Sequence, residues 1–231
     1  MLRILQVADA SGAVRVVAWD GEGEARAVNG VNATYELARQ AIAAGQTLAD
    51  YIRHVGLGDV VDLEKAAEEK RILLPITHPD PAHFIVAGTG LTHLGSADGL
   101  DKMHKAAQSE EKPTDSMRMF LMGVGGGKPK PGQAGVQPEW FYKGDGSQLR
   151  ATGEDLVSPA FALDGGDEPE LAGIYLAGDD GVTYRIGFCL AHEFSDHVTE
   201  KGNYPWLAHS QLRQAGPGPA LPAGAPPAHV H

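Results

Sequence analysis

A strong β-hairpin signal dominates the second half of this sequence. Positions 178–181 read Gly-Asp-Asp-Gly, and β-prone segments flank them over residues 168–177 and 182–193. Glycine and aspartate between two apolar, β-prone runs are typical of a tight antiparallel connection. The hairpin agrees with the composition, because 30 glycines and 15 prolines in 231 residues indicate many turns. We therefore expect a β-rich structure.

Acidic residues gather near the open end of this hairpin. Side chains at positions i and i+2 of a strand point to the same face, so Glu168 and Glu170 project together. A turn centred on the two aspartates places Ala191 opposite Glu168, with Glu193 one diagonal step away on the same face. The pattern therefore predicts that three carboxylates converge.

Two interpretations of these acids remain open from the residues alone. Three carboxylates a few Å apart take up protons or bind a cation, and oxygen ligands suit hard ions such as Mg²⁺, Mn²⁺ or Ca²⁺. Alternatively, they are exposed strand-edge charges paired with Lys or Arg. Pro169, between two of them, has no N–H to donate, so the strand should start, bulge or end a sheet there.

The first 75 residues predict a small N-terminal α/β domain. Three short β-prone runs before residue 29 form a meander, and helical periodicity follows from residue 34 to 55, with Thr34 as an N-cap. A proline-bracketed linker then places a domain boundary near residue 75. The second predicted domain covers residues 76–231, and the fold class is α+β.

Charge and composition exclude several kinds of partner. The chain has 19 Lys and Arg against 30 Asp and Glu, a formal net charge of −11, which disfavours nucleic acid and anionic membrane surfaces. No apolar run approaches the roughly 20 residues of a membrane helix. The N-terminus lacks the basic and apolar regions of an export signal. We expect a cytoplasmic protein whose partners are small molecules or proteins.

Several segments resemble, in the same order, motifs of the fumarylacetoacetate hydrolase superfamily, most closely its bacterial sugar-acid branch. That superfamily carries Glu-x-Glu on one strand and a third acid on a following strand, and Glu168, Glu170 and Glu193 match this pattern. The other similar segments are residues 88–93, 140–143, 153–159 and 194–197.

The resemblance implies a fumarylacetoacetate-hydrolase-like mixed β roll and a homodimer. It also implies that Glu168, Glu170 and Glu193 ligate a divalent ion, Mg²⁺ or alternatively Mn²⁺ or Ca²⁺. The third ligand is usually Asp in the superfamily, so Glu193 is a departure of one methylene group. The superfamily's catalytic domains continue for several strands beyond a Gly-Pro turn that resembles residues 218–219. We therefore expect this chain to be truncated at its C-terminus.

One departure from the superfamily bears on the reaction. Ser96 stands where the hydrolases have a catalytic histidine, and a serine without a base cannot activate water. Dehydration needs only one base for a C3 proton, and His93 and His104 compete for that role, with His93 preferred because it adjoins a predicted strand end. Thr92, Ser96 and Lys143 are the expected substrate-binding residues, and Lys143 is also a catalytic candidate.

The resemblance thus implies a metal-dependent enzyme that acts on a small-molecule 2-oxo acid through a metal-stabilised enolate. We favour dehydration of a 2-keto-3-deoxy sugar acid of the pentonate type. A C–C bond hydrolase of the acylpyruvate or fumarylacetoacetate type is the first alternative. A non-catalytic member that binds a metabolite is the second.

Overall fold

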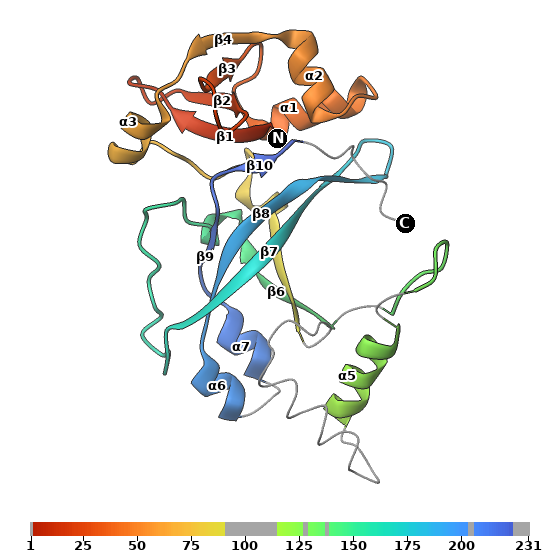
Figure 1. Cartoon of the computed structure of the whole chain (residues 1–231). Helices are drawn as coiled ribbons and strands as arrows, with labels where there is room; N and C mark the ends of the chain where they lie inside the picture. The colour runs from red at the N-terminus through yellow and green to blue at the C-terminus, as the bar shows by residue number, and fades with distance from the viewer. Residues whose placement is uncertain (1, 91–114, 127–128, 137–138, 203–205, 224–231) are drawn as a thin grey trace. The chain divides into compact units, whose positions relative to one another are not determined.

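The computed structural model describes residues 2–90, 115–126, 129–136, 139–202 and 206–223 (Figure 1). Contacts within the chain define two compact units, one formed by residues 1–85 with 144–230 and the other by residues 86–143. The domain boundary near residue 75 was inferred from sequence pattern and stays a prediction. Among the described residues, no helix is long and apolar enough to cross a membrane.

The first unit contains a five-stranded antiparallel sheet, in which the predicted meander is confirmed. Its order is β10-β1-β2-β3-β4. The strands are β1 (Arg3–Ala8), β2 (Val14–Trp19), β3 (Arg26–Val28), β4 (Leu57–Val60) and β10 (Leu221–Pro222). Strand β10 pairs with β1 at Ile4 and Leu221, so segments more than 200 positions apart in the sequence share this sheet.

Three helices belong to the same part of the chain, namely α1 (Thr34–Ala43), α2 (Leu48–Val55) and α3 (Leu63–Glu68). The predicted N-cap of α1 is wrong, because Ala33 occupies that position and Thr34 is the first helical residue. The backbone N–H of Thr34 donates instead to Oε1 of the buried Gln6, at 2.8 Å. A side chain from β1 thus accepts a hydrogen bond from the N-terminus of α1, the role expected of a local cap.

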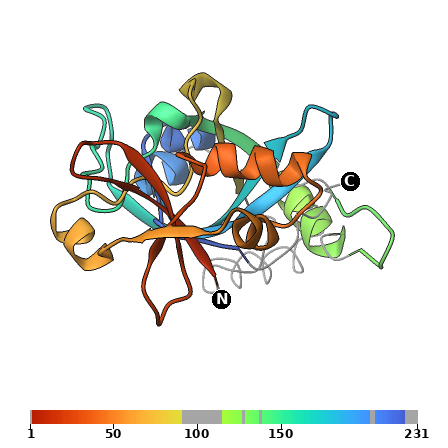
Figure 2. The same ribbon diagram turned by 90° about the horizontal axis from the view of Figure 1, so that it is seen from above.

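One hydrophobic core joins the five-stranded sheet, its helices and the predicted hairpin. Strand β1 contributes Ile4, α1 contributes Leu37 and α2 contributes Ile52, and Figure 2 shows these two helices from above. The hairpin contributes Ile174 and Leu176, which are both buried. Apolar burial on this scale fixes the closed end of the hairpin to the rest of the first unit.

The predicted hairpin is confirmed, and Figure 1 shows its two strands, β7 and β8, side by side. Strands β7 (Gly166–Ala177) and β8 (Thr183–Ser195) pair antiparallel, and β9 (Ala215–Pro217) adds to β8, giving the order β7-β8-β9. The connecting loop closes with Gly178 N–H donating to the carbonyl of Val182 at 2.7 Å. Asp180 Oδ1 accepts the N–H of Val182 at 3.0 Å.

The predicted register of this hairpin is wrong by two residues. Glu168 lies opposite Glu193, and Glu170 lies opposite Ala191. One residue of the difference arises because the loop spans residues 178–182, so that the closing pair is Ala177 with Thr183. The other arises from a β-bulge in which β8 carries an extra residue between its positions 185 and 187.

The remaining elements complete the α+β, strand-rich architecture that the sequence predicts. Helices α6 (His197–Gly202) and α7 (Leu207–Gln211) follow β8 and pack on each other. Two 3₁₀ turns, η1 (Pro81–His83) and η2 (Gly146–Gln148), also contact each other. The other unit contains most of β5 (Ile85–Gly90) and β6 (Glu139–Asp145), which pair, and α5 (Asp115–Gly126). The named pairs with a defined register are antiparallel, so a mixed β roll stays a prediction.

Candidate metal centre

The predicted convergence of three carboxylates is confirmed. Glu168 and Glu170 leave the same face of β7, and Glu193 leaves β8 directly opposite Glu168. One oxygen from each of the three side chains lies within 4.8 Å of the others, and all three residues are half-buried. The corrected register therefore brings the acids closer than the predicted diagonal arrangement would.

Pro169 lies between the two acids of β7 and is exposed. The prediction that the strand starts, bulges or ends at this proline is wrong, because β7 continues through it with regular pairing. In the described three-stranded sheet β7 is an edge strand, where a residue without an N–H is tolerated. The bulge of the hairpin is elsewhere, beside Ile174 and Tyr175. The acids thus stand on regular strand geometry, which keeps Glu168 and Glu170 on one face.

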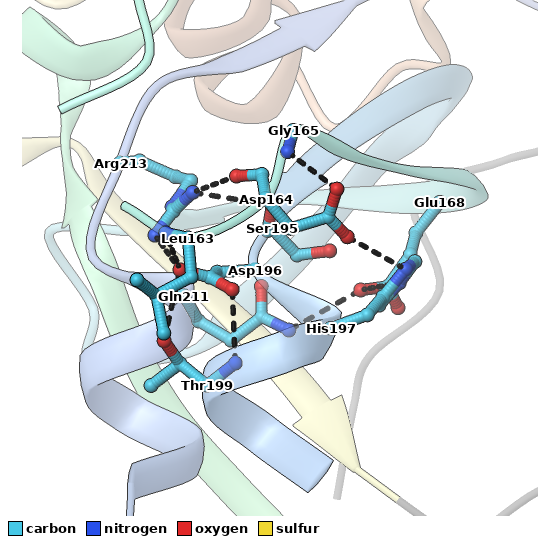
Figure 3. Close-up of polar contacts among 10 residues, drawn as sticks. All are labelled: Leu163, Asp164, Gly165, Glu168, Ser195, Asp196, His197, Thr199, Gln211 and Arg213. Carbon is cyan, nitrogen blue, oxygen red and sulfur yellow. Dashed lines mark hydrogen bonds and ion pairs between the residues drawn. The ribbon is translucent and has the colours of Figure 1, made fainter. Parts of the chain in front are cut away.

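Two side chains without a role in the sequence-based prediction contact Glu168 (Figure 3). The Nε2 atom of His197 lies 3.2 Å from Glu168 Oε1, and the amide of Gln211 donates to the same oxygen at 3.3 Å. His197 Nδ1 also lies 3.8 Å from a carboxylate oxygen of Asp164. Within the described part of residues 144–230, Glu168 thus contacts an imidazole ring and no Lys or Arg side chain.

A buried network fixes the chain between Glu193 and His197. Asp196, whose side chain is 1% exposed, accepts the N–H and the hydroxyl of Thr199, both at 2.9 Å, and the N–H of Leu163 at 2.8 Å. Arg213 Nη2 lies 3.6 Å from the same carboxylate, and its Nη1 donates to the carbonyl of Ser195 at 3.1 Å. These contacts join β8, α6 and the segment before β7 (Figure 3).

The protonation of Asp196 reflects this network. Burial by itself would raise its pKa, but the hydrogen bonds from Thr199 and Leu163 and the charge of Arg213 outweigh that effect. Together they lower the pKa of Asp196 to about 2, so the carboxylate stays ionised at neutral pH. Asp196 is therefore a structural anion that orients the turn from β8 into α6.

The donor set of the cluster fits a hard divalent cation. Glu168, Glu170 and Glu193 offer only carboxylate oxygens, the ligand type that Mg²⁺, Mn²⁺ and Ca²⁺ prefer. Like charges on directly opposed strand positions repel each other, and a cation between them removes that repulsion. The arrangement can therefore hold a metal ion without further change of register.

Of the other predicted site residues, the structure describes Lys143 alone. Lys143 lies in β6 and is 3% exposed. Thr92, His93, Ser96 and His104 lie outside the described residues. Their proposed roles in binding and catalysis stay predictions. A sequence signal for His197 existed, because it closes the segment 194–197 that carries the family resemblance.

No protein-family model and no curated protein matches this chain. Solved structures do match it. A hexagonal crystal form of 2-keto-3-deoxyarabinonate dehydratase aligns with a TM-score of 0.62 and 17% sequence identity, covering 97% of this chain and 68% of that one. The 2-keto-3-deoxy-D-arabinonate dehydratase complexed with magnesium and 2,5-dioxopentanoate aligns with a TM-score of 0.60 and 18% identity, covering 97% and 66%.

A structure from Mycobacterium abscessus, described as an uncharacterized protein, aligns with a TM-score of 0.54 and 14% identity, covering 96% of this chain and 68% of that one. The chain thus spans about two thirds of the length of these structures. At such low identity the comparison establishes the fold. The chain has the α+β, strand-rich fold of 2-keto-3-deoxyarabinonate dehydratase, and its carboxylate cluster lies within that fold.

Proposed function

We propose that this protein is a divalent-metal-dependent hydro-lyase that dehydrates a 2-keto-3-deoxy sugar acid. The observation that carries the proposal is the cluster of Glu168, Glu170 and Glu193 on two paired strands. Support comes from the shared fold, since one structure with that fold is a dehydratase that holds magnesium and 2,5-dioxopentanoate. Mg²⁺ is the favoured ion, with Mn²⁺ or Ca²⁺ as alternatives.

The three glutamates would hold the ion on the half-buried face of the hairpin. When bound there, a divalent ion supplies Lewis acidity toward the carboxylate and keto oxygens of a 2-oxo acid. The role of the chain is to fix the site that receives these oxygens. Asp196 and Arg213 hold the turn after Glu193, and His197 and Gln211 contact Glu168.

Dehydration also requires a base and groups that orient the substrate. The base takes the C3 proton, and the C4 hydroxyl leaves as water, so the net change is loss of one water molecule. We assign the base to His93 in preference to His104. Lys143, Thr92 and Ser96 are proposed to bind the substrate carboxylate and hydroxyl groups. We also propose a cytoplasmic homodimer, on the basis of the family resemblance.

A product assay tests the proposal. Purified protein is incubated with Mg²⁺ and 2-keto-3-deoxyarabinonate, and the dicarbonyl product is trapped with an aldehyde reagent. In parallel, acylpyruvates are supplied and pyruvate release is followed with lactate dehydrogenase. We expect the dicarbonyl product and no pyruvate. Pyruvate release without dehydration would replace the proposal with the C–C hydrolase. If both assays are negative but a 2-oxo acid binds, the protein is a metabolite-binding member.

A further inference from the structure

His197 is seated against a glycine at the start of the hairpin. Gly166 is the first residue of β7 and pairs with Ser195, two residues before His197. A Cβ atom on Gly166 would lie 2.8 Å from Cε1 and 2.9 Å from Nδ1 of the His197 ring, and 2.8 Å from Ser195 Oγ. Gly166 does not have a positive φ, so its backbone conformation does not require glycine. Glycine is needed there because a side chain would collide with the His197 ring.

The ring of His197 contacts one oxygen of Glu168. The Nε2 atom of His197 lies 3.2 Å from Oε1. A carboxylate that ligates a metal can only accept hydrogen bonds, so the proposed metal site requires the hydrogen on Nε2. Gln211, from α7, donates to the same oxygen at 3.3 Å. Two donors on separate helices thus engage one oxygen of a glutamate that stands opposite another glutamate (Figure 3).

We propose that His197, held in place by the space at Gly166, is a positioning residue that keeps the Glu168 carboxylate within reach of Glu170 and Glu193. This inference rests on the proposed metal site. Repulsion from the two neighbouring carboxylates favours Glu168 rotamers that point away from them. A fixed N–H donor on Oε1 opposes that rotation. The Glu168 side chain then loses less conformational entropy when an ion binds.

The size of the effect follows from metal sites in general. Groups that hydrogen-bond to metal ligands orient those ligands, and their loss typically weakens metal binding by about 10- to 100-fold. Gln211 provides a second donor to Glu168, so we expect replacement of His197 to weaken binding toward the lower end of that range. Of the two side chains, His197 should hold the Glu168 carboxylate more firmly, because its contact is shorter and its ring is confined at Gly166.

Four variants test the inference through binding of Mn²⁺ alone, measured from the electron paramagnetic resonance signal of the free ion. His197→Met removes the donor, whereas His197→Gln keeps an N–H donor. Gly166→Ala retains His197 but forces its ring to move. The control is Gly202→Ala, which lies on the same helix as His197 and has no atom within 4 Å of its added Cβ. Melting temperatures in EDTA report folding independently of metal.

We expect His197→Met and Gly166→Ala to raise the Kd for Mn²⁺ by about 10-fold or more. His197→Gln and Gly202→Ala should bind like the parent. A purely structural role for His197 would lower the melting temperature in EDTA and would not be rescued by Gln. If the parent binds Mn²⁺ and both His197→Met and Gly166→Ala bind it equally well, the positioning role is wrong while the proposed metal site stands. If the parent binds no Mn²⁺, both are wrong.

Discussion

Glu168 lies directly opposite Glu193 across the β7–β8 pair, with an oxygen of each within 4.8 Å of the other and of Glu170. Directly opposed side chains are the closest neighbours on the face of a sheet, and like charges there destabilise the pairing. The two carboxylates therefore repel each other in the folded protein, and a bound cation would remove this repulsion. Stability and metal binding should therefore be coupled at this hairpin.

The first prediction concerns stabilisation by metal. At a Mg²⁺ concentration of about 100 times the Kd, binding to the folded state alone adds about 2.7 kcal/mol. For a chain of this size that raises the melting temperature by roughly 5–10 °C. Glu168→Gln and Glu170→Gln should largely lose this shift. Glu68→Gln, an exposed change at the end of α3, should keep it. Equal shifts in all four proteins would exclude these ligands.

The second prediction is that loss of one acid stabilises the folded protein when no metal is present. Glu193→Gln removes one of the two facing charges, so in EDTA it should unfold at a higher urea concentration than the parent, by about 0.2–1 kcal/mol. With saturating Mg²⁺ the order should reverse, because the variant lacks a ligand. Urea titrations under both conditions measure this crossover. A variant less stable than the parent in EDTA would show that repulsion at this pair is negligible.

The third prediction follows from the lowered pKa of Asp196. A carboxyl group whose pKa falls from 3.8 to about 2 on folding stabilises the folded state above its unfolded pKa. The contribution is on the order of 2 kcal/mol at neutral pH, and it is lost as the pH falls toward 2. Asp196→Asn should therefore be less stable than the parent at pH 7.

Chemical denaturation at several pH values measures the difference in unfolding free energy between these two proteins. The difference should narrow between about pH 5 and pH 2, where the parent carboxylate takes up its proton. Other carboxylates titrate in both proteins and cancel in the comparison. A difference that stays constant over this range would mean that the Asp196 network does not favour the ionised form.

The fourth prediction tests the anchoring of α1. Gln6 is 1% exposed, accepts the N–H of Thr34 at 2.8 Å and donates to the carbonyl of Leu74 at 2.8 Å. Gln6→Met fills the space but leaves both backbone groups without this partner, at a cost of about 1–3 kcal/mol. Gln46→Met, at a half-buried position between α1 and α2, serves as the control. Urea unfolding that is unchanged in Gln6→Met would contradict this role.

The sequence predicted the hairpin and its acidic face because both depend on local rules. Glycine and aspartate mark the loop, and alternation of side chains places Glu168 and Glu170 together whatever the register. The register itself was not predictable from these rules. It depends on where the loop closes and on a bulge beside Ile174, and packing of Ile174 and Leu176 into the shared core accompanies both.

The contacts around Glu168 were beyond sequence reasoning for a different reason. His197 follows β8 directly, but Gln211 is 43 positions from Glu168 and Asp164 precedes the hairpin. In the folded chain, the buried ion pair of Asp196 with Arg213 and the turn into α6 lie beside these groups. Similarly, Gln6 replaced the expected Thr34 cap because a strand residue far from the helix in sequence reached its first N–H.

The most direct test of the account is to locate the ion. Crystals grown or soaked with Mn²⁺ and measured near the manganese absorption edge give an anomalous difference map that shows only the metal. The account predicts one peak per chain, bonded to carboxylate oxygens of Glu168, Glu170 and Glu193. A peak bound elsewhere, or no peak at the β7–β8 hairpin in well-ordered crystals with saturating Mn²⁺, would contradict it.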